Sequence, residues 1–142
     1  MNEFDLNRFL TAQDGGYSRA LNEIKNAQKR SHWMWYIFPQ WNGLGRTIIS
    51  IKYAIKSREE AIAYFEHPVL GIRLREITKV FLNIDNKSAK DVLGSPDFLK
   101  MKSCMTLFHL IQKETDFFNL VLEKFYDGKL CKRTQQKLEK YF

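Results

Sequence analysis

The segment Lys29–Gln40 carries the densest set of side chains in the sequence that could bind a ligand. Its middle holds a histidine and four aromatic residues within a short stretch: His32, Trp33, Trp35, Tyr36 and Phe38. Large aromatic side chains usually fill a core, and this is the simplest interpretation of the segment. An aromatic wall with a few polar groups, such as His32 and Gln40, is also typical of ligand pockets. In a ligand-binding chain we expect Trp33, Trp35 and Gln40 to contact the ligand.

A glycine-bracketed turn, Gly43-Leu44-Gly45-Arg46, follows this segment closely. Glycine lets a ligand approach the backbone because it has no side chain. We expect Gly43 and Gly45 to permit such an approach and Arg46 to bind an anion beside them. The four residues match no phosphate-binding loop, so the turn alone identifies no ligand.

His67 stands at a proline-started helix, where the first backbone N–H groups lack partners within the helix. These N–H groups and the positive end of the helix dipole favour anions. His67 therefore either caps the helix or contacts an anion, and Arg73 would add a positive charge nearby. Gly71 costs about 1 kcal/mol relative to alanine within a helix, which indicates close packing against another backbone or a closely approaching ligand.

Asp97, Lys100, Ser103 and Thr106 share one predicted helix, and Asp97 and Lys100 are spaced as an i,i+3 ion pair. Lys100 and Ser103 lie on one face, where a lysine could lower the pKa of a serine. Their order is opposite to that of the Ser-x-x-Lys nucleophile pair, which argues against hydrolysis. The two hydroxyls either bond back to the preceding helical turn or line a cavity with Lys100 at its mouth.

The sequence lacks the usual signatures of catalytic and metal sites. It holds no HExxH motif, no Rossmann fingerprint and no assignable Ser-His-Asp arrangement. The two cysteines, Cys104 and Cys131, do not pair with a histidine at metal-site spacing. We expect no metal, no cofactor and two reduced thiols, with Cys104 in the core. Whether the chain is an enzyme stays open; His32 or His67 is the best candidate acid or base, because histidine titrates near neutral pH.

Four strings, in order, resemble the signature of a bacterial family: KRSHWMWYIFPQ, GLGR, HPVLGIRLRE and DFLKMKSCMTLF. The family is the domain of unknown function numbered 1810, and the resemblance runs from about Phe4 to Tyr126. It implies a mainly helical fold and no established activity. Some such proteins carry the label calpastatin, but nothing in this sequence resembles a disordered protease-inhibitor repeat.

Helix signals dominate the elements that must position these residues. They predict an all-α fold of about six to eight helices in a single domain, residues 1–142. The clearest signal is a buried stripe made of Leu70, Leu74, Ile77 and Phe81. Other patterns predict a helix capped by Asp5, one from Tyr17 whose apolar spacing continues roughly in phase to Phe38, and a buried helix over 48–55, where a strand is the alternative. They also predict helices capped by Ser57 and Ser88, one from Thr115 to Tyr126 and a last one from Thr134.

The formal net charge is +7, and the second half of the chain carries most of the excess. A basic surface attracts polyanions, but the lysines are scattered among acids and no nucleic-acid-binding motif is present. No apolar run approaches the roughly 18 residues of a membrane-spanning helix, and the N-terminus does not resemble a secretory signal. We expect a cytoplasmic protein that contacts no membrane, and the oligomeric state stays open.

These observations favour a site for a small anionic molecule such as a nucleotide or a phosphorylated metabolite. The alternatives are a protein-interaction domain without a ligand and a weak, non-specific nucleic-acid-binding module. The expected contacts are His32 and His67 as acid or base, with Trp33, Trp35, Gln40, Gly43, Gly45, Arg46, Arg73, Lys100 and Ser103 around the ligand. We expect His32, His67 and Arg46 to face one shared pocket.

Overall fold

The computed structural model describes residues 4–114 and 117–140. Within them the chain forms ten helices and no strand, apart from one isolated bridge between Trp41 and Ile55. The all-α prediction is confirmed. The helices are α1 (Asn7–Gln13), α2 (Gly16–Lys25), α3 (Met34–Ile37), α4 (Ile48–Lys52), α5 (Arg58–Glu66), α6 (Leu70–Leu82), α7 (Ala89–Leu93), α8 (Asp97–Ile111), α9 (Phe117–Tyr126) and α10 (Lys132–Glu139).

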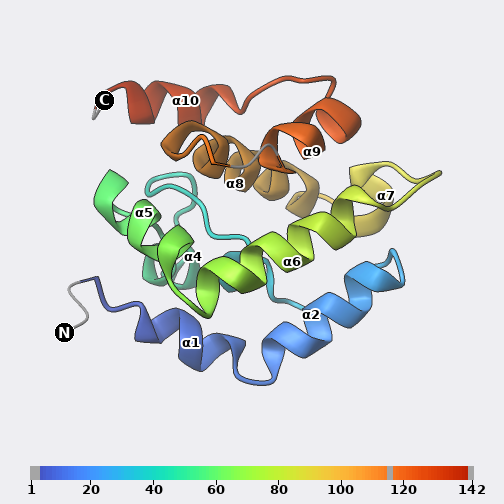
Figure 1. The fold of residues 1–142 in the computed structure, drawn as a ribbon, viewed down its shortest axis with the longest axis horizontal. Helices are drawn as coiled ribbons and strands as arrows, with labels where there is room; N and C mark the ends of the chain where they lie inside the picture. The colour runs from blue at the N-terminus through green and yellow to red at the C-terminus, as the bar shows by residue number, and fades with distance from the viewer. Residues whose placement is uncertain (1–3, 115–116, 141–142) are drawn as a thin grey trace.

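Helix α8 lies at the centre of the fold and packs against α3, α5, α7, α9 and α10. Met101, Cys104, Met105, Leu107 and Phe108 are fully buried, so α8 is apolar on nearly every side, as expected for a central helix. α10 runs along one side of the molecule, and α1 and α2 lie on the opposite side (Figure 1). No helix among the described residues is long and apolar enough to cross a membrane.

Helix α6 packs against α2, α5 and α9 and carries the predicted stripe. Leu70, Leu74, Ile77 and Phe81 are all buried, which confirms that prediction. Gly71 explains how α6 meets the end of α5. A Cβ atom at Gly71 would lie 1.9 Å from the carbonyl oxygen of Phe65, so close packing against a backbone is the reason for this glycine.

The predicted long helix from Tyr17 to Phe38 is wrong. α2 ends at Lys25, because Ala27 adopts a left-handed backbone with φ +55° and the N–H of Lys29 turns to the carbonyl of Val92. The chain is helical again only at α3, a single turn that ends before Pro39. Short turns such as α3 and α4 bring the number of described helices above the predicted range.

The predicted buried helix over 48–55 is also wrong. Only α4 is helical there; Thr47 caps it by accepting a hydrogen bond from the N–H of Ser50. Ile48, Ile49 and Ile51 are 86%, 55% and 51% exposed. The residue of α4 that is buried is Ser50. The apolar composition of this stretch therefore does not indicate that it is buried.

Side-chain caps agree better with the sequence. Ser57 caps α5 and Ser88 caps α7, the latter as a full capping box with Asp91. Asp5 does not cap α1, because its own backbone is left-handed and Leu6 occupies the cap position. The last helix begins at Lys132 rather than Thr134. The predicted Thr115 cap lies outside the described residues.

Candidate functional site

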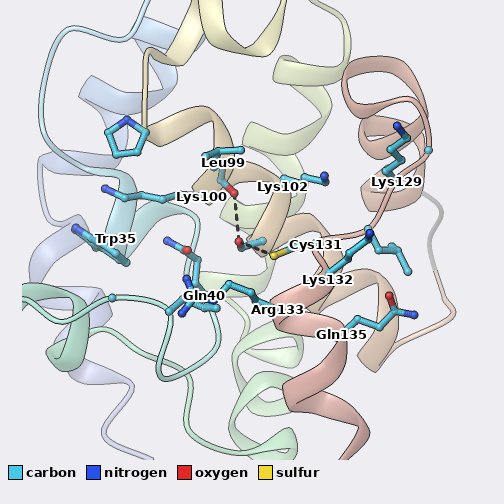
Figure 2. Close-up of a pocket in the computed structure, with 16 residues that line it drawn as sticks. Trp35, Gln40, Leu99, Lys100, Lys102, Lys129, Cys131, Lys132, Arg133 and Gln135 are labelled. Carbon is cyan, nitrogen blue, oxygen red and sulfur yellow. Dashed lines mark hydrogen bonds between the residues drawn. The ribbon is translucent and has the colours of Figure 1, made fainter.

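A pocket of about 1090 Å³ opens between the first half of α8, the start of α10 and the segment 35–45 (Figure 2). We call it the basic pocket. Its walls are apolar where leucines and a proline line them: Leu44, Pro96, Leu99 and Leu130. Its polar residues include Gln40, Ser103, Cys131 and Gln135, with the five cations described next.

Five basic side chains line the basic pocket, and none of the described carboxylates or histidines does so: Lys100, Lys102, Lys129, Lys132 and Arg133. Lys100 is engaged by a carboxylate, since its Nζ lies 2.9 Å from Asp97. Within the described part of the chain, Lys102, Lys129 and Lys132 form no ion pair. A concave surface lined by one sign of charge concentrates ligands of the opposite sign.

Trp35 and Lys100 form one wall of this pocket, where Lys100 Nζ lies 4.2 Å from the centre of the Trp35 ring. Asp97 fixes Lys100 from the other side and also pairs with Lys29 at 2.8 Å. Burial alone would raise the pKa of Asp97, but the hydrogen bonds and charges of the two lysines lower it below its ordinary value. Asp97 is therefore an ionised anchor that positions Lys100.

Gln40 contributes a buried amide with an unmet hydrogen-bonding need. The residue is only 5% exposed, and its Nε2 has no hydrogen-bond partner among the described residues. Its backbone is fixed, because the N–H of Ile55 donates to the Gln40 carbonyl at 2.9 Å. A buried N–H without an acceptor costs about 1–3 kcal/mol. An acceptor bound in the pocket would remove that cost.

Cys131 is the residue at the start of α10, and it joins α10 to α8. Its N–H donates to Thr106 Oγ1 at 2.9 Å, and its Sγ lies 3.3 Å from Ser103 Oγ. The Ser103 hydroxyl also donates to the carbonyl of Leu99 at 3.2 Å, and the Thr106 hydroxyl donates to the carbonyl of Lys102 at 2.8 Å. Thr106 thus follows the back-bonding alternative, while Ser103 both bonds back and lines the pocket.

The two thiols differ in their ionisation. Cys104 is fully buried, and burial raises the pKa of its thiol well above the ordinary value. Burial also opposes ionisation of the half-buried Cys131. There, however, the Ser103 hydroxyl and the polar groups of the first turn of α10 outweigh it, so the pKa of Cys131 is lowered. A thiol at a helix N-terminus near cations commonly shows this behaviour.

The structure brings five of the sequence-predicted residues together in the basic pocket: Trp35, Gln40, Gly45, Lys100 and Ser103. Gly43 lies beside the pocket and contacts α10 instead, accepting a hydrogen bond from Arg133 at 3.3 Å. Its φ of +90° favours glycine, and a Cβ there would lie 2.9 Å from Lys137 Nζ.

His32 and Trp33 lie at a second, smaller pocket of about 380 Å³. Trp35 and Lys100 line both pockets and therefore form the wall between them. His32 is exposed, whereas Trp33 is only 1% exposed and donates its indole N–H to Glu23 at 2.9 Å. Trp33 thus has a partner within the protein.

Glu23 is the buried centre of this corner between α2 and α3. Its carboxylate accepts hydrogen bonds from the backbone N–H of Arg30 (2.6 Å) and from the N–H and hydroxyl of Ser31, in addition to Trp33. Burial alone would raise the pKa of Glu23, but these four donors lower it to about 2. We call this cluster the Glu23 corner.

His67, Arg73 and Arg46 are not brought into the basic pocket. His67 caps α6, since its Nδ1 accepts hydrogen bonds from the N–H groups of Val69 and Leu70, both at 3.1 Å. Arg73 reaches Gln13 at 3.3 Å, and Arg46 is exposed. The expectation that His32, His67 and Arg46 face one pocket is therefore not met.

Sequence reasoning did not place Cys131, Lys102 or Gln135 at a site. Lys129, Lys132 and Arg133 entered it only through the excess of positive charge in the second half of the chain. A sequence signal was present, because a cysteine followed directly by two cations opens the last helix. No group of three metal-ligating side chains lies close enough to hold a metal ion within residues 4–114 and 117–140.

Comparison with known proteins supports the fold but supplies no activity. The crystal structure of the conserved hypothetical protein Rv1873 from Mycobacterium tuberculosis superposes with a TM-score of 0.94 at 40% identity, covering 96% of this chain and 97% of that one. No curated protein matches the chain. The model of a family described as "Protein of unknown function (DUF1810)" matches residues 3–138, and the chain belongs to that family.

Proposed function

We propose that the chain binds a small organic anion, such as a nucleotide or another phosphorylated metabolite, in the basic pocket. The observation that carries this proposal is Gln40, a residue that is 5% exposed, lines a pocket with five cations and has no partner for its Nε2 among the described residues. Phosphate and carboxylate oxygens are strong acceptors for such donors. Apolar walls beside these donors suit the uncharged part of an organic ligand.

The pocket charges, rather than a stacked ring, supply most of the affinity in this proposal. One face of Trp35 already holds Lys100 at 4.2 Å. Lys132 and Arg133 extend from the first turn of α10, where the N-terminal end of the helix dipole also favours an anion. Because these side chains are near solvent, the affinity should fall as salt concentration rises.

The test is thermal denaturation and calorimetric titration with AMP, ATP, ribose 5-phosphate and uncharged adenosine. The three phosphorylated probes should raise the melting temperature, and adenosine should do so least. Lys132→Ala/Arg133→Ala should weaken binding by about 1.5–3 kcal/mol for each charge-assisted hydrogen bond that it removes. Lys25→Ala/Lys113→Ala removes the same net charge outside the pocket and should leave binding unchanged.

The proposal is wrong if none of the three phosphorylated probes stabilises the protein at about 1 mM, where micromolar ligands raise melting temperatures clearly. It is also wrong if both double variants weaken binding equally, since the anion would then respond only to overall charge.

A further inference from the structure

Cys131 lines the basic pocket at the point where α10 begins, and its thiol is half-buried (Figure 2). Sγ lies 3.3 Å from the Ser103 hydroxyl, which also lies 3.2 Å from the Leu99 carbonyl. A hydroxyl has one proton and can donate it to only one of them. With a neutral thiol it can donate to Leu99, and with a thiolate it can rotate to donate to the sulfur.

The charged side chains that line the pocket with Cys131 are all cations. Lys102 comes from α8, Lys129 from the connection between α9 and α10, and Lys132 and Arg133 from α10. No carboxylate that would repel the thiolate, and no histidine that would protonate it, lines the pocket among the described residues. Hydrogen bonds from Ser103 and from the first turn of α10 lower the pKa of Cys131 against the effect of its burial.

A separate observation indicates that a ligand belongs beside this sulfur. Gln40, on the segment that faces α10, directs a buried amide into the same pocket, and this amide has no acceptor among the described residues. Figure 2 draws Gln40 between Trp35 on one side and Cys131 on the other. An acceptor supplied by a ligand would therefore bind in the pocket that Cys131 also lines.

We propose that Cys131 is a nucleophile that forms a mixed disulfide with an anionic low-molecular-weight disulfide, such as oxidised glutathione, held in the basic pocket. This rests on the proposed function, since it is the pocket charges that attract the anionic reagent. The Cys131 thiolate attacks one sulfur of the disulfide, a new S–S bond forms and the old one breaks. The second half leaves as a thiolate and takes the electron pair, so one disulfide is exchanged for another.

Disulfide exchange fits the residues of this pocket better than acyl or phosphoryl transfer. Hydrolysis through a cysteine requires a general acid or base, and neither a histidine nor a carboxylate of the described chain lines the pocket. Exchange requires only a thiolate and a leaving thiolate, so it needs no proton donor. Cys104 is 0% exposed, so its thiol is not available to attack the mixed disulfide and release the bound half. The mixed disulfide should therefore persist until an external thiol reduces it.

The experiment incubates the reduced protein at low salt with three disulfides at equal concentration and follows Cys131 by peptide mass spectrometry. Oxidised glutathione is anionic, hydroxyethyl disulfide is neutral and cystamine is cationic. The rate with each disulfide is divided by its rate with a cysteine-containing reference peptide. This ratio should be about tenfold or more higher for oxidised glutathione than for cystamine, because a charged cleft raises the local concentration of its counter-ion. Cys104 should stay unmodified, and Cys131→Ser should abolish the reaction.

A pH series tests the role of Ser103. With neutral hydroxyethyl disulfide the rate should rise with pH as the Cys131 thiol ionises. The midpoint of this rise should lie below the ordinary cysteine pKa of about 8.5. Ser103→Ala should move this midpoint upward, while Ser103→Thr, which keeps the hydroxyl, should restore it. Lys132→Ala/Arg133→Ala should flatten the difference among the three disulfides, and Lys25→Ala/Lys113→Ala should not.

The two ways in which the proposal can fail are distinguishable. If Cys131 reacts with all three disulfides no faster than the reference peptide, it is not the nucleophile, and nucleotide binding would still be judged by its own titration. If Cys131 is fast with all three and shows no preference for the anion, the anionic substrate class is wrong. That second result also counts against the proposed anion site.

Discussion

The Glu23 corner and the basic pocket both bury polar side chains, but the two regions differ in how completely the hydrogen bonds of these side chains are formed. At the Glu23 corner one carboxylate receives four donors from the protein. In the basic pocket the Gln40 amide finds no acceptor among the described residues, and no described carboxylate lines the pocket beside its cations. A buried group with all its partners stabilises a fold, whereas one without them is available to a ligand.

The largest expected effect belongs to the Glu23 corner. Glu23→Ala leaves the Trp33 indole, the Ser31 hydroxyl and two backbone N–H groups without an acceptor. We expect the free energy of unfolding to fall by about 3 kcal/mol, measured by urea denaturation. The exposed Glu139→Ala should change it by no more than about 0.5 kcal/mol. A decrease below about 1 kcal/mol for Glu23→Ala would remove the contrast between the two regions.

Acid titration gives a second measure of that corner. The pKa of Glu23 is lowered from 4.5 to about 2. Its contribution to the free energy of unfolding is therefore fully present above pH 4.5 and is lost as the pH falls through about 2. The shift corresponds to about 3 kcal/mol at most. Stability of the wild type should fall more steeply across this range than that of Glu23→Gln. Parallel pH curves for the two proteins would contradict the assignment.

His67 tests whether a satisfied polar group elsewhere also acts structurally. His67→Ala removes the acceptor for two N–H groups at the start of α6, and should lower the free energy of unfolding by about 1 kcal/mol. Binding of AMP should be unchanged, as measured by calorimetric titration. A large decrease in affinity with normal stability would return His67 to the ligand site.

The smallest expected effect on stability belongs to Gln40. Gln40→Leu keeps the approximate volume and removes a donor that lacks a partner among the described residues, so the free energy of unfolding should not fall by more than about 1 kcal/mol. Affinity for AMP should nevertheless fall several-fold. The exposed Gln136→Leu serves as control for both measurements. Strong destabilisation by Gln40→Leu would mean that its amide has a structural role after all.

The sequence predicted the fold where local rules act alone. The stripe from Leu70 to Phe81 and the caps at Ser57 and Ser88 depend on neighbours within one helix, and they are present as expected. The isoleucines of α4 show the limit. Their composition suggested burial, but Ile48, Ile49 and Ile51 are exposed, and Ser50 is the residue of α4 that is buried.

The site was predictable to a smaller extent. Ser103 stood out because buried hydroxyls need partners or a cavity, and Lys100 because it shares a helix face with Ser103. Trp35 and Gln40 stood out as members of an aromatic segment with a few polar groups. Cys131 did not stand out, because its environment depends on the packing of α10 against α8. That contact joins residues 28 positions apart, and no local pattern encodes it.

The bridge at Trp41 and Ile55 also has a consequence for how this chain can vary. Two backbone hydrogen bonds, from Asn42 to Ile55 and from Ile55 to Gln40, both 2.9 Å long, close the stretch between them at its base. The entropy of closing such a loop grows only slowly with its length. The exposed residues Ile48 and Ile49 should therefore tolerate substitutions and short insertions far better than their apolar character suggests. The stretch is a natural grafting point, provided that its closed base, which also holds Gln40, is left intact.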